Sequence, residues 1–180
     1  GTRNLEHLSS LTQLTELSIA SSSAHDWSPL GHLINLTSLE ITNSPTLKRL
    51  DHLRSLNKLS RLELENLDRL ASLASMEHLT SLTELVLRNL PLVEDLSPLG
   101  GLTALRDLSV RDIDRVTDVS PLGTLKALKN LTLGLRNVTQ VKSLAGLTQV
   151  ESLRLLWREV VTDVDALAAL PATVKGSKEH

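Results

Sequence analysis

Apolar residues recur along the chain in a unit of 22 or 23 residues. Within a unit they first occupy every third position, as in Met76, Leu79 and Leu82, and then form a pair separated by one residue. A period of two is typical of a short strand with one buried face, and a period near three indicates tight 3₁₀ or α-helical turns. The pattern therefore predicts seven strands, each preceded by a short helical segment. The seven pairs are Leu17/Ile19, Leu39/Ile41, Leu62/Leu64, Leu85/Leu87, Leu108/Val110, Leu131/Leu133 and Leu153/Leu155.

One such unit is too small to bury its own apolar residues, and this predicts how the units are arranged. Stacking the units places each Leu against its counterparts above and below, which makes one continuous core. The composition agrees, because 43 of the 180 residues are Leu while Phe and Tyr are absent. A core with the same shape in every layer rarely needs large rings. We expect Trp27, which replaces a repeated aliphatic residue, to fill this core.

The tripeptide Ser-Pro-Leu occurs at the same place in three units, and an Asp lies two residues before each Ser. Ser is favoured as a helix N-cap and Pro in the first helical turn, while a carboxylate is stabilised near the positive end of a helix. We therefore interpret these residues as helix starts rather than as catalytic acids. The pairs of Asp and Ser are Asp26 and Ser28, Asp95 and Ser97, and Asp118 and Ser120.

Residues 95–110 and 116–133 show the unit most completely, with Asp-Leu-Ser-Pro-Leu or Asp-Val-Ser-Pro-Leu before the strand pair. They resemble leucine-rich repeats of the 22-residue bacterial kind, and the resemblance covers nearly all of residues 4–170. It implies an α/β solenoid, curved and right-handed. Its parallel β-sheet would form the concave face, and short 3₁₀ or α segments the convex face.

The resemblance also suggests a division of the chain. We expect the leucine-rich-repeat domain to occupy residues 4–171, with about seven repeats and a partial eighth. Residues 1–3 resemble a cloning scar, and residues 172–180 a disordered or vector-derived tail. No polar capping repeat is evident, although solenoids normally need one. We therefore expect a fragment of a longer protein, whose uncapped ends allow self-association.

The chain departs from these families three residues after each apolar pair, where they place a buried Asn. An apolar or small residue at this position is similar to the repeats of NLR-type immune receptors and their bacterial nucleotide-switch relatives. Asn or Asp lies one residue earlier in four units, as Asn43, Asn66, Asn89 and Asp112, and we predict a turn role there. The position itself holds Ser22, Ser44, Leu67, Leu90, Ile113, Arg136 and Arg158.

Composition and motifs argue against several function classes. The chain has no cysteine for a disulfide or a thiolate site, and its net charge of -2 argues against nucleic-acid binding. The chain has no run of about 18 apolar residues, the length that a membrane-spanning helix needs. Dinucleotide, phosphate-binding and nucleophile motifs are missing, and the His residues are not grouped as metal ligands. We expect no enzyme activity, cofactor or metal, and a cytoplasmic location, with an extracellular one left open.

Side chains alternate along a strand, so the residues between and beside the apolar pairs face the concave surface. Acidic residues dominate this set in the first four units and arginines in the later ones. Charges about 5 Å apart would act as one field and orient a partner with complementary patches. The alternative is a face that is only polar and solvated. The predicted partner-binding residues are Glu40, Glu63, Glu65, Glu84, Arg88, Asp107, Arg111, Arg136, Arg154, Trp157 and Arg158.

Two of these predictions concern the last complete unit. An exposed Trp157 beside Arg158 is the chemistry of an interface hot spot, and the alternative is that Trp157 covers the unfinished end of the stack.

These features predict a module that binds a protein ligand or a neighbouring domain of its parent chain. The resemblance to receptor repeats implies a sensing or signalling protein with a nucleotide-switch domain. A secreted or surface adhesin like the internalins is one alternative. A second is the substrate-recruiting arm of an enzyme whose catalytic domain lies elsewhere, and a third is an engineered solenoid, against which the irregular units argue.

Overall fold

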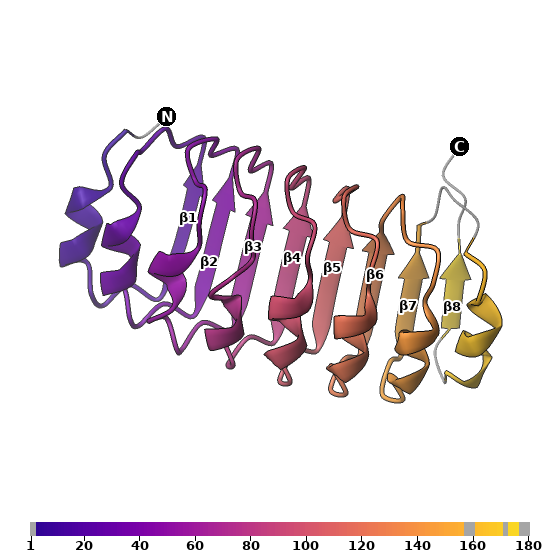
Figure 1. Ribbon diagram of the computed structural model, residues 1–180. Coiled ribbons are helices and arrows are strands. Elements are labelled where there is room, and N and C mark those ends of the chain that lie inside the picture. Colours follow the sequence, from indigo (N-terminus) through magenta and orange to yellow (C-terminus); the bar gives the residue numbers. More distant parts are fainter. Residues whose placement is uncertain (1–2, 157–160, 171–172, 177–180) are drawn as a thin grey trace.

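The computed structural model describes residues 3–156, 161–170 and 173–176. Within them, eight short strands form one sheet in chain order, and every neighbouring pair is parallel (Figure 1). Seven of the strands contain the apolar pairs, which confirms the predicted parallel sheet of a solenoid. The strands are β1 (Glu16–Ala20), β2 (Ser38–Thr42), β3 (Arg61–Glu65), β4 (Glu84–Arg88), β5 (Asp107–Arg111), β6 (Asn130–Gly134), β7 (Ser152–Leu155) and β8 (Thr173–Gly176).

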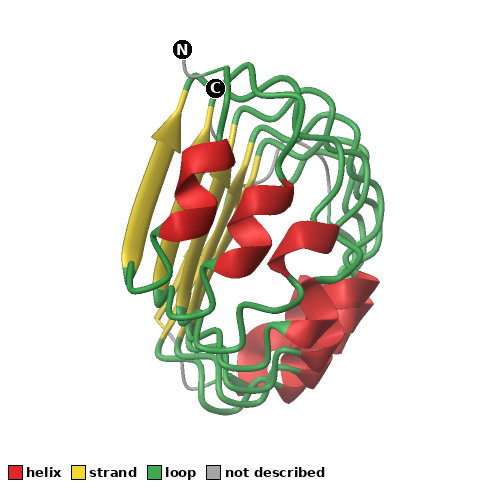
Figure 2. Ribbon diagram, turned by 90° about the vertical axis from the view of Figure 1, so that its left-hand side faces the viewer, coloured by secondary structure: helices red, strands yellow, loops and turns green. Residues whose placement is uncertain are grey.

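A 3₁₀ helix precedes each strand and lies across the core from the sheet (Figure 2). We call one 3₁₀ helix with its following strand a coil. All eight described helices are 3₁₀, where the sequence left 3₁₀ and α open. They are η1 (Glu6–Ser10), η2 (Ser28–His32), η3 (Asp51–Leu53), η4 (Met76–His78), η5 (Ser97–Gly101), η6 (Ser120–Thr124), η7 (Lys142–Gly146) and η8 (Val164–Ala169).

The period of three follows from the backbone hydrogen bonds of these helices. The N–H of Leu99 donates to the carbonyl of Leu96 at 2.9 Å, and the N–H of Leu102 donates to that of Leu99 at 3.0 Å. Side chains at i and i+3 eclipse in a 3₁₀ helix, so apolar residues three apart all face the core.

The core runs unbroken between the sheet and the 3₁₀ helices. In-register pairing places Leu85 between Leu62 and Leu108 of the neighbouring strands, and none of the three is more than 3% exposed. Trp27 is also 3% exposed, which confirms that it fills the core. Each buried aliphatic side chain contributes roughly 1.5–3 kcal/mol, so several in each coil offset much of the ordering entropy.

A residue with left-handed backbone conformation follows each of the first five strands. Its φ angle is 56° at Ser21, 50° at Asn43, 55° at Asn66, 49° at Asn89 and 55° at Asp112. Asn and Asp tolerate this conformation better than other side chains, because their short polar groups bond locally. The predicted turn role of the Asn and Asp residues is confirmed, and Ser21 has the same role in the first coil.

The sixth coil lacks this turn residue, which corrects one prediction. Leu135 follows Gly134 directly and is 1% exposed, whereas Arg136 is exposed. Leu135 therefore occupies the buried position that the sequence spacing assigned to Arg136. The assignment was wrong because the spacing shows that a unit is one residue short, but not where the residue is missing.

Two serines occupy that buried position in the first two coils. Ser22 and Ser44 are fully buried. The Ser44 hydroxyl accepts a hydrogen bond from the N–H of Ser22 at 3.2 Å and donates to the carbonyl of Thr42 at 3.0 Å. A buried hydroxyl is tolerated here because it is used both as acceptor and as donor.

The Ser-Pro-Leu helices begin differently from the prediction. Each Ser is the first helical residue rather than the N-cap, and the N-cap residues Trp27, Leu96 and Val119 make no side-chain cap bond. The preceding Asp carboxylate instead accepts the N–H of the Ser. These bonds join Ser28 to Asp26 at 2.8 Å, Ser97 to Asp95 at 2.7 Å and Ser120 to Asp118 at 2.7 Å.

This bonding changes the acidity of two of the carboxyl groups. Hydrogen bonds from the side chain and backbone of Ser28 hold the pKa of Asp26 below its ordinary value, and Ser97 does the same to the pKa of Asp95. A lowered pKa in the folded state means that the stabilisation is present above the pKa of an unfolded Asp. It is lost as the pH falls through the lowered value.

The eighth coil extends further than the sequence indicated. Residues 172–180 were expected to form a tail, whereas the backbone of Thr173–Gly176 pairs with β7 as strand β8, with Leu153 opposite Val174. Helix η8 precedes it, and Leu167 and Leu170 are buried. The strand was not recognisable because it carries one apolar residue in place of a pair.

Gly100 and Gly123 occupy the same place in neighbouring Ser-Pro-Leu-Gly helices, but the space for a Cβ atom differs between them. A Cβ at Gly123 would lie 2.5 Å from the carbonyl oxygen of Ser143 in the next coil, whereas one at Gly100 would come no closer than 3.5 Å to Pro121. We expect Gly123→Ala to lower the free energy of unfolding by about 1–3 kcal/mol, because the backbone of the next coil must shift.

Gly100→Ala is the matched control and should leave the free energy of unfolding unchanged or raise it by up to about 1 kcal/mol. Urea unfolding followed by circular dichroism measures both variants. Equal losses would contradict the close approach of coils at Gly123.

Candidate protein-binding surface

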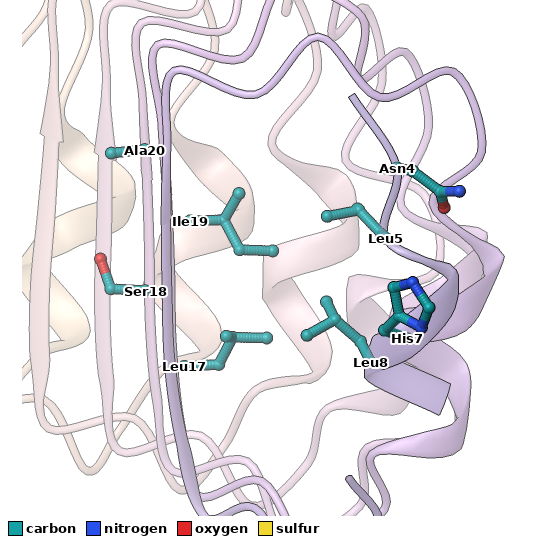
Figure 3. A pocket seen from close by; sticks show the side chains of 8 residues that line it. All are labelled: Asn4, Leu5, His7, Leu8, Leu17, Ser18, Ile19 and Ala20. Carbon is teal, nitrogen blue, oxygen red and sulfur yellow. The ribbon is translucent and has the colours of Figure 1, made fainter. Parts of the chain in front are cut away.

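The concave face consists of the strand side chains that point away from the core. Figure 3 shows the alternation in β1, where Leu17 and Ile19 point inward while Ser18 and Ala20 point to the other side of the sheet. The parallel register aligns these outward positions from strand to strand, so that Glu40 lies beside Glu63 and Thr132 beside Arg154. Neighbouring strands are about 4.8 Å apart, which makes the face a set of continuous side-chain columns.

Arg61 organises the acidic residues of the third and fourth coils. Its guanidinium forms an ion pair with Glu84 of the next strand and another with Glu63 at 3.2 Å. Partial burial alone would lower the pKa of Arg61, but attraction to Glu84 and Glu63 outweighs it and raises the pKa. Two of the carboxylates predicted to meet a partner are therefore already paired within the protein, where the single charge of Arg61 offsets one of their two.

Arg88 links the acidic and basic halves of the face. It lies 3.7 Å from the carboxylate of Glu65 and 3.8 Å from that of Asp112. Asp107 is also satisfied internally, since it accepts a hydrogen bond from the side-chain amide of Asn130. The charged side chains at the centre of the concave face are thus engaged with one another, although carboxylates outnumber guanidinium groups there.

Charge without a partner remains toward the two ends of the face. Among the described residues, Glu16 and Glu40 on the first two strands and Arg154 on the seventh make neither an ion pair nor a hydrogen bond through their side chains. Arg111 lies between them on β5, beside Gly134, where the missing side chain leaves room for it. The predicted polarity is therefore concentrated at the ends rather than spread over two halves.

The structure brings most of the predicted residues onto this one face. Arg136 instead lies in the turn after β6, where it pairs with Asp114 at 3.3 Å. Trp157 and Arg158 lie outside the described residues, so their role stays a prediction. The concave residues are Glu40, Glu63, Glu65, Glu84, Arg88, Asp107, Arg111 and Arg154.

An amide ladder borders the concave face, and the sequence reasoning assigned its members only to turns. The side-chain amide of Asn66 donates to Asn43 at 2.9 Å, and that of Asn89 donates to Asn66 at 2.8 Å. The spacing of 23 residues was the signal that could have revealed it.

The first coil presents an apolar hollow of about 350 Å³ at the end of the stack (Figure 3). Leu5, Leu8, Leu17 and Ile19 point into it, and Leu11 nearby is 48% exposed. This hollow is the open end of the core, with Ser18 and Ala20 of β1 at its border. Self-association through such an end stays a prediction.

In the described part of the chain, no group of three or more His, Asp or Glu side chains has the arrangement of a metal site. No helix there is both long enough and apolar enough to cross a lipid bilayer.

The chain is similar to known proteins in its structure rather than in its sequence. No protein-family model and no curated protein matches the sequence. Solved structures do match: internalin C2 of Listeria monocytogenes gives a TM-score of 0.80 at 25% identity, over 97% of this chain and 77% of that one. A leucine-rich-repeat protein of Leptospira interrogans gives a TM-score of 0.80 at 21% identity, over 97% of this chain and 47% of that one. The chain has the leucine-rich-repeat fold.

A leucine-rich-repeat ectodomain from a plant shares the fold as well. It belongs to the membrane receptor kinase GASSHO1/SCHENGEN3 of Arabidopsis thaliana, in complex with CASPARIAN STRIP INTEGRITY FACTOR 2. The TM-score is 0.72 at 20% identity, over 94% of this chain and 22% of that one. The likeness to NLR-type repeats stays a prediction.

The ion pairs of Arg61 predict a small, salt-dependent stabilisation. Replacing it in Arg61→Leu leaves Glu63 and Glu84 without their counter-charge, but all three groups are partly exposed. We expect the free energy of unfolding to fall by less than about 1 kcal/mol, and the difference from the native protein to shrink at high salt. Urea titrations at low and high ionic strength test this. A larger loss that salt does not change would show that Arg61 acts through packing instead.

Proposed function

We propose that this leucine-rich-repeat domain is a protein-interaction module whose concave face recognises a protein ligand. The observation that carries the proposal is the distribution of charge on that face. At the centre the charged side chains pair with one another, while Glu16 and Glu40 at one end and Arg154 at the other have no partner among the described residues. A ligand with a basic patch and an acidic patch would be oriented along the columns by these ends.

The fold supports this proposal in a second way. The plant ectodomain of the same fold was solved in complex with CASPARIAN STRIP INTEGRITY FACTOR 2, so a leucine-rich-repeat solenoid can present a ligand-binding surface. A binding role needs no catalytic group or cofactor from the chain, and we propose none.

We further propose that the domain serves a larger sensing or signalling protein in the cytoplasm. The similarity to an internalin favours a second candidate, a secreted or surface adhesin. The gene of the parent protein distinguishes the two: a nucleotide-switch domain supports the first, and a signal peptide with a wall anchor supports the second.

The test of the concave face is a quantitative pull-down from extract and culture medium of the source cells. The native domain is compared with a triple variant in which Arg88, Arg111 and Arg154 are each changed to Gln. Neutral Gln removes the cations without placing new carboxylates beside existing ones. We expect recovery of the partner to fall about tenfold or more, as for loss of several interface charges.

A triple variant at Arg54, Arg106 and Lys142, also changed to Gln, is the matched control, because it alters net charge equally but leaves the concave strands intact. Circular dichroism must show that both variants fold. If a partner is recovered equally by all three proteins, the concave basic residues do not bind it.

A further inference from the structure

The turns that follow β1, β2 and β3 enclose a second surface, on the strand-exit edge of the solenoid. These turns lie at the upper ends of β1, β2 and β3 in Figure 1. Two adjoining hollows of about 470 and 210 Å³ share His25 and Thr46 as lining residues. We call this surface the loop cleft and define it by its basic side chains Arg3, His25, Lys48, Arg49, His52 and Arg69.

The loop cleft concentrates positive charge that the protein leaves without a partner. Among the described residues, Arg3, Lys48 and Arg69 make no ion pair and no side-chain hydrogen bond. Arg49 does have a counter-charge, since it lies 2.6 Å from Asp51. No carboxylate lines either hollow. Because the whole chain carries a net charge of -2, this local excess is not a property of the surface in general.

Other cations of the described surface behave differently. Lys129 pairs with Glu151 at 2.7 Å, and Arg115 pairs with Glu94 at 2.8 Å, in both cases across neighbouring coils. The coil spacing therefore brings opposite charges together elsewhere. In the loop cleft it brings His52 near Asp26, but Arg3, Lys48 and Arg69 have no ion pair among the described residues.

A buried core residue forms part of the inner wall of the loop cleft. Trp27 lines the smaller hollow and is only 3% exposed, and its indole N–H donates to the hydroxyl of Thr46 at 3.4 Å. The nearest carboxylate of the first turn, Asp26, is occupied by the N–H of Ser28. The basic residues come from four successive coils, from Arg3 before η1 to Arg69 before η4, so they spread over about 14 Å.

These dimensions indicate the kind of ligand. A single small anion cannot reach cations spread over that distance. Alternate side chains of an extended peptide lie roughly 7 Å apart on the same side, so two or three carboxylates of an acidic segment match the spacing. We propose that the loop cleft binds an extended acidic peptide segment of a partner protein. This surface goes beyond the concave site and shares no residue with it.

A dye-labelled octaglutamate peptide is the probe, and fluorescence anisotropy at about 0.05 M salt, where screening is moderate, measures its binding. We expect saturable binding to the native domain. The double variant Lys48→Glu with Arg69→Glu should weaken it about tenfold or more, because two attractions become repulsions. The double variant Arg106→Glu with Lys142→Glu changes net charge by the same amount outside the loop cleft and should weaken binding less than about threefold.

A second readout locates the bound peptide. In a Trp157→Phe background, Trp27 is the one remaining Trp, and we expect its emission to change in step with the anisotropy. Absence of saturable binding, equal weakening by both double variants, or an unchanged Trp27 emission at saturation would each overturn the proposal. Inorganic phosphate that displaces the peptide at equal charge concentration would also overturn it, in favour of a small-anion site.

The outcome is independent of the concave-face test. The loop-cleft variant keeps Arg88, Arg111 and Arg154, so it should still recover a concave-face partner in the pull-down.

Discussion

The structure depends on the stacking of Leu side chains from one coil onto the next. No coil has an interior of its own, because its 3₁₀ helix and strand present their apolar residues to neighbouring layers as much as to each other. Apolar residues repeat every three positions in the helix and every two in the strand, so all of them point into the core between helices and sheet. Parallel pairing then follows, since every coil must enter its strand from the same side.

This constraint decides where the chain is free to vary. Among the described residues, inward positions hold mostly Leu, Val, Ile or Met, with Trp27, Ala24 and the hydrogen-bonded Ser22 and Ser44 as exceptions. A close approach such as that of Gly123 to the next coil leaves no room for a side chain. Outward strand positions and turn residues carry no such demand. The strand register holds their charges in columns, so the sheet fixes where the charged groups lie and the sequence fixes which groups they are. The two proposed surfaces lie on these two classes of position.

The sequence was sufficient for most of the fold, because repetition reports directly on packing. Seven strands, their parallel order, the core and the turn role of Asn43 and Asn66 could all be predicted from spacing. It was insufficient where one residue decides the outcome. The deletion before Leu135 displaced Arg136 from the buried position, and Val174 alone did not reveal β8.

The candidate sites were predictable to a smaller extent. Membership of the concave face follows from alternation along strands, but which carboxylates remain unpaired depends on side-chain conformations, as the reach of Arg61 to Glu84 shows. The loop cleft was missed because its residues come from turns of different length and composition. Arg3, His25 and Lys48 do share one position of the repeat, two residues before Leu5, Trp27 and Leu50, but the fourth coil has Ala71 there and supplies Arg69 from two residues earlier.

The central claim is that coils stack in register, and repeat deletion tests it most directly. Removing residues 85–107 takes out one complete unit of 23 residues and joins Glu84 to Leu108, which keeps every later coil in phase. We predict a folded protein that unfolds cooperatively in urea, with a smaller denaturant dependence because less surface is buried. Removing residues 85–96 instead puts a helix start where a strand belongs, and should abolish most of the free energy of unfolding. Equal stability of the two deletion variants would contradict the account.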